Sequence, residues 1–507
     1  MKRLSQVNKF SKSIFVLGAL ITSAFASAAE RPNVLMLCID DMNDWCGFLE
    51  GHPQAQTPNM DALAAKGVNF TNAHCTAPGC SPSRNALFLG VEPHKSGLYP
   101  FYNLNKINDG SLDRFTVPLP KMFKDNGYKT CGLTKVYHNP DNSWRQSEQW
   151  DEYKSYGDSN LKVIKEKGYH PEPYNKRTIA CPASNELKDF RDYQSAMHAV
   201  RFLEKNHTEP FFLAVGFILP HTSFIMPEAN WDRFDFPIEE PPFRADDLAD
   251  VPLAGRSNAQ IYVVIPVRRD NAWEEIRRGY LASVNFTDDN VGRVLDALEG
   301  SPYADNTIII LWSDHGFHLG EKRSFSKFSL WNEATRVPFI IYDPRNKTGN
   351  GRVCEEALGL INVYQTLADL TGLEAPDYVD GMSLSPWLSN PSLSKEEPTM
   401  TTWGRGNYTL RTKEWRYTRY FDGSEELYSE ANDPNEWINL AQNPAYAEIK
   451  SKFIPYLPQA EAAQVAEGRE LYNVADADDP MRVIQSFKRY AKRYSKANLQ
   501  PPLYLSD

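Results

Sequence analysis

This chain of 507 residues lacks several features that would assign it to other classes of protein. Its net charge is −10, so it has no excess of positive charge to attract nucleic acid. The spacing of its seven cysteines fits no zinc site. Beyond residue 29 there is no internal repeat and no apolar run that resembles a transmembrane helix. We therefore expect a globular protein that binds no nucleic acid, and an anionic substrate requires a local basic pocket.

The first 29 residues have the three parts of a secretory signal peptide. Lys2 and Arg3 begin a basic segment, an apolar stretch covers residues 14–25, and small residues follow at 26–29. The alternative is a membrane anchor, but the apolar stretch is too short to span a bilayer comfortably. No cysteine follows the small residues, which argues against a lipoprotein. We predict an exported protein, periplasmic or secreted, without a stable membrane anchor.

An odd number of cysteines in an exported chain leaves at least one outside intrachain disulfides. Cys80 is the candidate for that residue, because it lies in the segment Cys80-Ser81-Pro82-Ser83-Arg84. Pro82 suits the first turn of a helix, and Gly90 is a suitable helix end. Cys80 would then stand at a helix N-terminus, where the helix dipole and Arg84 favour an anion. A buried structural cysteine beside a surface arginine is the alternative. The remaining cysteines are either paired or simply buried thiols.

Two apolar segments predict buried strands of a parallel sheet, and each ends in polar side chains. The segment 33–39 is followed by Asp40 and Asp41, and the segment 307–312 leads to Asp314 and His315. Open α/β sheets place their sites at such strand ends. Adjacent carboxylates repel unless a cation lies between them, and a hard cation such as Ca²⁺ or Mg²⁺ suits oxygen ligands. For Asp40 and Asp41 taken alone, two solvated loop aspartates are the alternative.

Together these segments resemble the type I sulfatases, whose signature is Cys-x-Pro-Ser-Arg in a turn that opens a helix. The resemblance covers roughly residues 31–440 when the separated motifs are joined. It implies that a formylglycine-generating enzyme converts Cys80 to formylglycine, the nucleophile. It also implies one Ca²⁺ ligated by Asp40, Asp41, Asp314, His315 and the modified Cys80.

The resemblance assigns roles to further residues. Lys135, Lys327 and Arg84 would compensate the negative charge of the sulfuryl group. His221 would protonate the departing alcohol, and His138 would be the base that releases sulfate. Three departures or ambiguities accompany these roles. Thr134 replaces the usual glycine before the lysine, Leu219 replaces the lysine of Lys-Pro-His, and Lys322 and Arg323 compete with Lys327 for its role.

The resemblance implies an alkaline-phosphatase-like α/β/α sandwich with a smaller C-terminal α+β subdomain. We place the signal peptide at residues 1–29, the catalytic domain at 30–390 and the C-terminal subdomain at 391–507. Long irregular segments at 139–185 and 223–271, the latter with Arg268 and Arg269, are expected to shape the substrate site. We therefore expect a hydrolase that acts on sulfated oligosaccharides or polysaccharides. A phosphate or phosphonate ester hydrolase of the same fold, or an inactive glycan-binding relative, is the alternative.

Overall fold

A computed structural model describes residues 31–139, 144–157, 180–183, 186–259, 272–469 and 474–496. The expected signal peptide, most of the segment 139–185, and Arg268 with Arg269 lie outside the described residues. Along the part of the chain that is described, no helix combines the length and apolar character needed to cross a membrane.

A sheet of eight strands forms the centre of the molecule. Its middle strands are continuous apolar segments, which are buried on both faces as the sequence predicts. Neighbouring strands are parallel except β12, which runs antiparallel to β9 and to β2. In spatial order the strands are β13 (Arg352–Cys354), β2 (Val68–Phe70), β12 (Phe339–Tyr342), β9 (Thr307–Ser313), β1 (Asn33–Ile39), β7 (Phe211–Gly216), β4 (Lys129–Thr134) and β5 (Glu152–Lys154).

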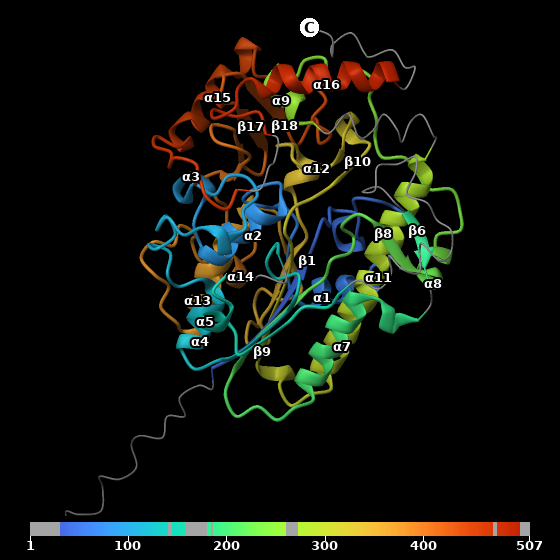
Figure 1. Cartoon of the computed structure of the whole chain (residues 1–507), viewed down its shortest axis with the longest axis vertical. Coiled ribbons are helices and arrows are strands. Elements are labelled where there is room, and N and C mark those ends of the chain that lie inside the picture. The colour runs from blue at the N-terminus through green and yellow to red at the C-terminus, as the bar shows by residue number, and fades with distance from the viewer. Residues whose placement is uncertain are drawn as a thin grey trace, which may run out of the picture.

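Helices cover both faces of this sheet, because alternate side chains of each strand point to opposite sides (Figure 1). Leu35 and Leu37 of β1 pack into one hydrophobic core, whereas Val34 and Met36 pack into the other. The first core is covered by α1 (Pro58–Lys66), α7 (Arg191–Leu203) and α11 (Trp273–Glu299). The second is covered by α2 (Cys80–Leu89), α4 (Leu119–Asp125) and α13 (Val363–Thr371). The predicted α/β/α sandwich is therefore confirmed.

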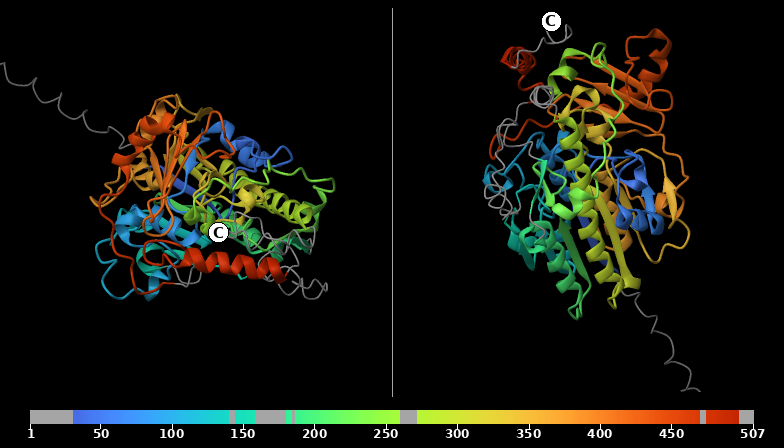
Figure 2. Two further views of the ribbon diagram at one scale, coloured as in Figure 1. Left: turned by 90° about the horizontal axis from the view of Figure 1, so that it is seen from above. Right: turned by 90° about the vertical axis from the view of Figure 1, so that its right-hand side faces the viewer.

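A second, antiparallel sheet follows in the chain and lies at one end of the sandwich (Figure 2). Its strands are β15 (Thr399–Thr402), β16 (Tyr408–Arg411), β17 (Trp415–Arg419) and β18 (Glu425–Ser429). A hairpin turn at Asp422-Gly423 joins β17 to β18, and Gly423 has a φ of 83°. The later helices α15 (Ala447–Phe453) and α16 (Arg482–Lys496) accompany this sheet.

Buried hydrogen bonds tie the second sheet to the sandwich. Arg416 of β17 is fully buried and pairs with Glu436, and its Nη1 donates to Leu330 O at 3.0 Å. Glu426 of β18 accepts a hydrogen bond from Trp331 Nε1 at 2.9 Å. These contacts fix the second sheet beside the loops that follow β9.

All seven cysteines are buried and carry free thiols. The question of pairing that the sequence left open is therefore resolved in favour of buried thiols.

Candidate active site

Two neighbouring parallel strands bring four of the predicted site residues together. β1 and β9 pair from Asn33 opposite Thr307 to Ile39 opposite Ser313, so the residues that follow leave the sheet side by side. The backbone N–H of Asp41 donates to Asp314 Oδ1 at 3.2 Å. Asp40, Asp41, Asp314 and His315 are all buried.

Cys80 is the first residue of α2, as the sequence predicts. Gly79 before it is extended, and the helix ends at Gly90 with a φ of 70°. Cys80 Sγ lies 3.3 Å from His315 Nε2 and 3.2 Å from Lys327 Nζ. Burial opposes ionisation of this thiol, but the positive charges of Lys327, His315 and Lys135 lower its pKa well below the ordinary value. Cys80 is thus a buried cysteine in a positively charged environment.

Arg84, one helical turn after Cys80, is buried among the ends of three strands. Its Nε donates to Asp314 Oδ2 at 2.7 Å, and its Nη2 donates to Ile39 O at 3.0 Å. Its Nη1 donates to the carbonyl oxygens of Lys135 and Val136. Most of the guanidinium donors therefore bind the protein itself. Arg84 holds the ends of β1, β4 and β9 together, and its charge acts on the site from behind.

The end of β4 delivers Lys135 and His138. Lys135 Nζ lies 2.8 Å from Asp40 Oδ2, and His138 forms a hydrogen bond with the Cys80 thiol. Thr134, which replaces the family's glycine, has a φ of 53°. A β-branched residue adopts this left-handed conformation rarely. The turn therefore keeps a backbone conformation that suits glycine. The contacts around Thr134 offset the conformational strain of this residue.

His221 lies on the turn after β7. Its Nε2 is 3.9 Å from Asp41 Oδ2, and its Nδ1 lies 2.6 Å from the carbonyl oxygen of Thr222. Its side chain is 30% exposed, whereas those of Asp41 and His315 are at most 1% exposed. A partly exposed imidazole beside a buried site is suited to meeting the outer part of a substrate.

The loop after His315 resolves the ambiguity between its three basic residues. Lys327 reaches Cys80 and forms an ion pair with Asp41 Oδ1. Lys322 is buried elsewhere, 2.8 Å from Asp247 Oδ1, and Arg323 Nη1 donates to Ala245 O at 2.9 Å. Lys327 is therefore the lysine of this loop that lies at the site.

A divalent metal fits the donor atoms of this site. Asp40, Asp41, Cys80 and His315 each present one ligand atom, and these atoms lie within 4.8 Å of one another. Oδ1 of Asp40 and Oδ2 of Asp41 are buried and accept no hydrogen bond, and Oδ2 of Asp40 faces the ammonium of Lys135 at 2.8 Å. Buried carboxylate oxygens are stabilised by cations, and oxygen donors suit a hard one. Asp314 borders the group, with its Oδ1 3.5 Å from His315 Nε2.

The charges at the site are strongly coupled. Burial and the charge of Asp40 raise the pKa of Asp314 to about 7, although Arg84 opposes the change. Burial opposes the charged form of His315, but Asp314 and the Cys80 thiolate outweigh it and raise its pKa to about 9. Strongly shifted pKa values in one buried cluster are typical of functional sites.

Several residues that the sequence patterns do not indicate support the backbone around the site. Tyr280 of α11 donates its hydroxyl hydrogen to Asp41 O and receives the N–H of Asn43, both at 2.8 Å. Ser313 Oγ accepts the N–H of Met42 at 3.0 Å. A side chain at Gly216 would place its Cβ 2.2 Å from the carbonyl carbon of Lys135. These roles depend on contacts between distant segments, so no local pattern indicates them.

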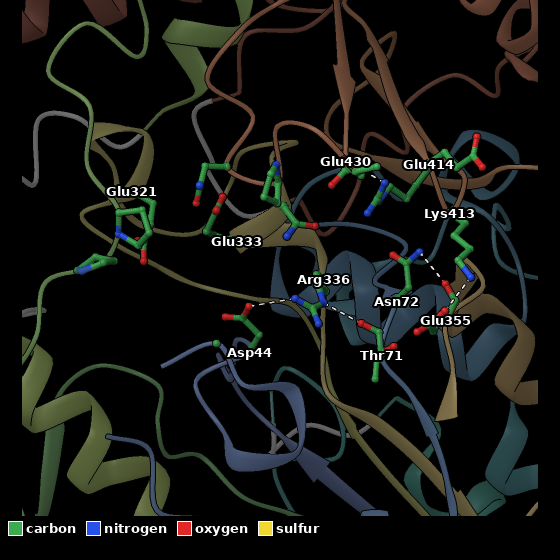
Figure 3. A pocket seen from close by; sticks show the side chains of 18 of the residues that line it. Asp44, Thr71, Asn72, Glu321, Glu333, Arg336, Glu355, Lys413, Glu414 and Glu430 are labelled. Atoms are coloured by element: carbon green, nitrogen blue, oxygen red, sulfur yellow. Dashed lines mark hydrogen bonds and ion pairs between the residues drawn. The ribbon is translucent and has the colours of Figure 1, made fainter. Parts of the chain in front are cut away.

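A separate cavity of about 670 Å³ lies near the loops after β1 and β2 and the second sheet (Figure 3). Arg336 reaches Asp44 across it, and Lys413 pairs with Glu355. Six acidic and three basic side chains line it. The acidic residues are Asp44, Glu321, Glu333, Glu355, Glu414 and Glu430, and the basic ones are Arg336, Arg411 and Lys413. This cavity does not include the residues around Cys80.

A second group of metal-type side chains comprises Cys131, Glu152 and His198. His198 Nε2 already pairs with Glu152 Oε1 at 2.7 Å, and its Nδ1 is 2.8 Å from the Tyr156 hydroxyl. Both ring nitrogens are engaged, so nothing in this group requires a metal.

Comparison with known proteins agrees with this geometry. A "Sulfatase" family model matches residues 32–373, and a model described as "N-sulphoglucosamine sulphohydrolase, C-terminal" matches residues 320–463. A "Sulfatase" of Formosa agariphila is 36% identical, over 86% of this chain and 88% of its own. Iduronate 2-sulfatase of Mus musculus is 31% identical, over 69% of this chain and 70% of its own.

Among solved structures, the phosphonate monoester hydrolase of Agrobacterium radiobacter superposes with a TM-score of 0.68 at 22% identity. The match covers 84% of this chain and 95% of that one, and it supports the fold alone. The family model and the first relative span most of the described sandwich and the Cys80 site. This chain therefore belongs to the type I sulfatase family of hydrolases.

Proposed function

We propose that this protein is an exported sulfatase that hydrolyses sulfate esters on sugars of an acidic polysaccharide or of its oligosaccharides. One observation carries the proposal. Cys80 stands at a helix N-terminus, with the ammonium of Lys327 3.2 Å away and Lys135 bound to the adjacent Asp40. A concentration of positive charge around a buried nucleophile position is what an anionic ester requires.

The residues of the chain supply binding, orientation and proton transfer. Formylglycine formed from Cys80, together with a Ca²⁺ held by Asp40, Asp41, Asp314 and His315, would provide the nucleophile and a Lewis acid. Lys135 and Lys327 bind the sulfuryl oxygens and offset the charge that develops on them. Arg84 keeps the strand ends aligned.

The two histidines lie on different sides of this arrangement. His221 Nε2 faces Asp41 from the partly exposed side and holds the proton that the leaving alcohol takes up. His138 contacts residue 80 directly, so it is placed to accept a proton from that residue when sulfate is released.

Two further observations support a glycan substrate. The family relative from Mus musculus acts on iduronate, a sugar acid, as its name states. The N-terminal 29 residues have the pattern of an export signal, which would place the enzyme where extracellular polysaccharide fragments occur. Leu219 replaces the lysine of the Lys-Pro-His pattern, so we do not propose iduronate itself.

A phosphonate or phosphate ester hydrolase is the second candidate, because the phosphonate monoester hydrolase has the same fold. The test is a comparison of kcat/KM on matured protein. The substrates are sulfated carrageenan, ulvan and glycosaminoglycan oligosaccharides, nitrophenyl sulfate, choline sulfate and the matched nitrophenyl phosphate, with Cys80→Ser as the inactive control. We expect the highest value on a sulfated oligosaccharide, because neighbouring sugars add binding energy to catalysis. A preference for nitrophenyl phosphate would establish the second candidate, and a preference for a small sulfate would remove the polysaccharide assignment.

A further inference from the structure

We propose that Asp192 is a positioning residue that holds the turn carrying His221 in its working place. The inference rests on the proposed function, in which His221 protonates the leaving alcohol. Asp192 is the second residue of α7 and is 2% exposed. Its Oδ1 accepts the backbone N–H of Ile218 and its Oδ2 accepts that of Leu219, each at 2.9 Å.

This pair of hydrogen bonds is one half of a clamp on the turn after β7. The other half comes from α11, where Thr287 Oγ1 donates to Leu219 O at 2.9 Å. Within the turn, the N–H of His221 donates to Ile218 O at 2.8 Å. Leu219, two residues before His221, is therefore held on both sides. Its backbone N–H is bound from α7 and its carbonyl oxygen from α11.

The position of the carboxylate is chemically suited to this role. Asp192 lies in the first turn of α7, where the helix dipole stabilises a negative charge. Charged hydrogen bonds to backbone N–H groups are stronger than neutral ones. Both carboxylate oxygens are used on consecutive N–H groups, so the clamp sets the direction of the chain as well as its location.

Release of the clamp would act on the imidazole. His221 is fixed at one nitrogen, because Nδ1 contacts Thr222 O at 2.6 Å, and its Nε2 faces Asp41 at 3.9 Å. A shift of the turn moves Nε2 relative to the leaving-group oxygen, while Cys80 and the lysines keep their places. The loss should therefore fall on proton donation and leave sulfuryl binding nearly unchanged.

The experiment compares esters whose alcohols differ in acidity. Nitrophenol leaves without a proton, whereas a sugar hydroxyl requires one. For Asp192→Asn, which keeps the shape but replaces one acceptor oxygen with an NH₂ group that cannot accept a backbone N–H, we expect kcat/KM on a sulfated sugar to fall roughly 10- to 100-fold. On nitrophenyl sulfate the fall should be less than about threefold. The double variant Asp192→Asn/His221→Ala should have nearly the same kcat/KM on the sulfated sugar as His221→Ala alone, because the effects of coupled residues are not additive.

Asp288 provides a matched control. It is also a buried aspartate, and its carboxylate accepts the N–H groups of Asn59 and Met60 at 3.1 and 2.8 Å, at the start of α1. Asp288→Asn should lower stability without changing the ratio of the two ester activities. If Asp192→Asn does not fold, Thr287→Val removes the other half of the clamp and should give the same selective loss.

The outcomes separate this inference from the proposed function. If Asp192→Asn and Thr287→Val lower kcat/KM equally on both esters, as Asp288→Asn is expected to do, then Asp192 has a purely structural role and the inference is overturned. If His221→Ala itself shows no dependence on the leaving group, the proposed role of His221 fails instead. A selective loss in His221→Ala and in both clamp variants supports the inference.

Discussion

The ammonium group of Lys327 lies 3.2 Å from the sulfur of Cys80, whereas Lys322, five residues earlier, is buried 2.8 Å from Asp247. Two lysines of one short loop therefore lie in two different environments. Lys327 lies at the Cys80 site, and Lys322 fixes the loop against the segment 223–259 and against Glu436 O. Sequence proximity to the site motif does not distinguish them.

Substitution of these two lysines should therefore have different effects. Lys327→Ala should lower kcat/KM by about 100-fold or more, because a preorganised charge at the sulfuryl group is lost. Lys322→Ala should lower the free energy of unfolding by roughly 3–5 kcal/mol, since it leaves the buried Asp247 without its partner. Steady-state kinetics and denaturant unfolding measure the two quantities. A stable, inactive Lys322→Ala would contradict the assignment.

We predict formylglycine at position 80 of the active protein. Peptide mass spectrometry should show sulfur replaced by oxygen at Cys80 and at no other cysteine. Cys80→Ser should bind substrate without turnover, whereas Cys75→Ser, which alters another buried thiol, should still be converted at position 80. Full activity of protein in which Cys80 remains unmodified would reject the nucleophile assignment.

Removal of divalent metal should lower both activity and thermal stability. Oδ1 of Asp40 and Oδ2 of Asp41 are buried and accept no hydrogen bond, so bound Ca²⁺ should stabilise the folded protein and not the unfolded chain. At a concentration 100 times Kd the gain is about 2.7 kcal/mol, seen as a rise in Tm when Ca²⁺ is added to chelator-treated protein. Asp40→Asn should abolish the rise. Asp44→Asn should keep it, because Asp44 pairs with Arg336 at the separate cavity. An unchanged Tm in the wild type would contradict the metal site.

Glu92 should make the protein less stable as pH rises. Burial, and then the charge of Asp380, raise the pKa of Glu92 from 4.5 to about 8. The unfolded chain loses this proton near pH 4.5 and the folded chain near pH 8. The stability present below pH 4.5 is thus lost as pH rises through this interval. Glu92→Gln removes the effect.

Its measurement compares unfolding at two pH values. Glu92→Gln and wild type should be equally stable near pH 4.5, and the variant should be more stable near pH 8.5 by about 1–3 kcal/mol. Glu204→Gln, at an exposed position, should change stability little at either pH. An equal advantage of Glu92→Gln at both pH values would show that the charge of Glu92 is not the cause.

Local patterns in the sequence determined the elements and much of the site. Continuous apolar segments are compatible with strands buried on both faces, which is why β1 and β9 were recognised. Parallel pairing then requires their carboxyl ends to meet, so Asp40 and Asp314 lie together. Pro82 and Gly90 bound α2 for equally local reasons of backbone geometry.

Other features were decided only by the tertiary structure, because they depend on which distant groups compete for the same partner. Arg84 binds Asp314 and backbone carbonyls, since the strand ends approach closely enough to occupy its donors. Asp192 and Thr287 clamp Leu219 from two helices that lie far apart in the chain. Hydrogen-bond partners at such separations leave no periodicity or spacing in the sequence. The sequence therefore determined which side chains gather at the candidate site, and the packing of the helices on the sheet decided how they are held.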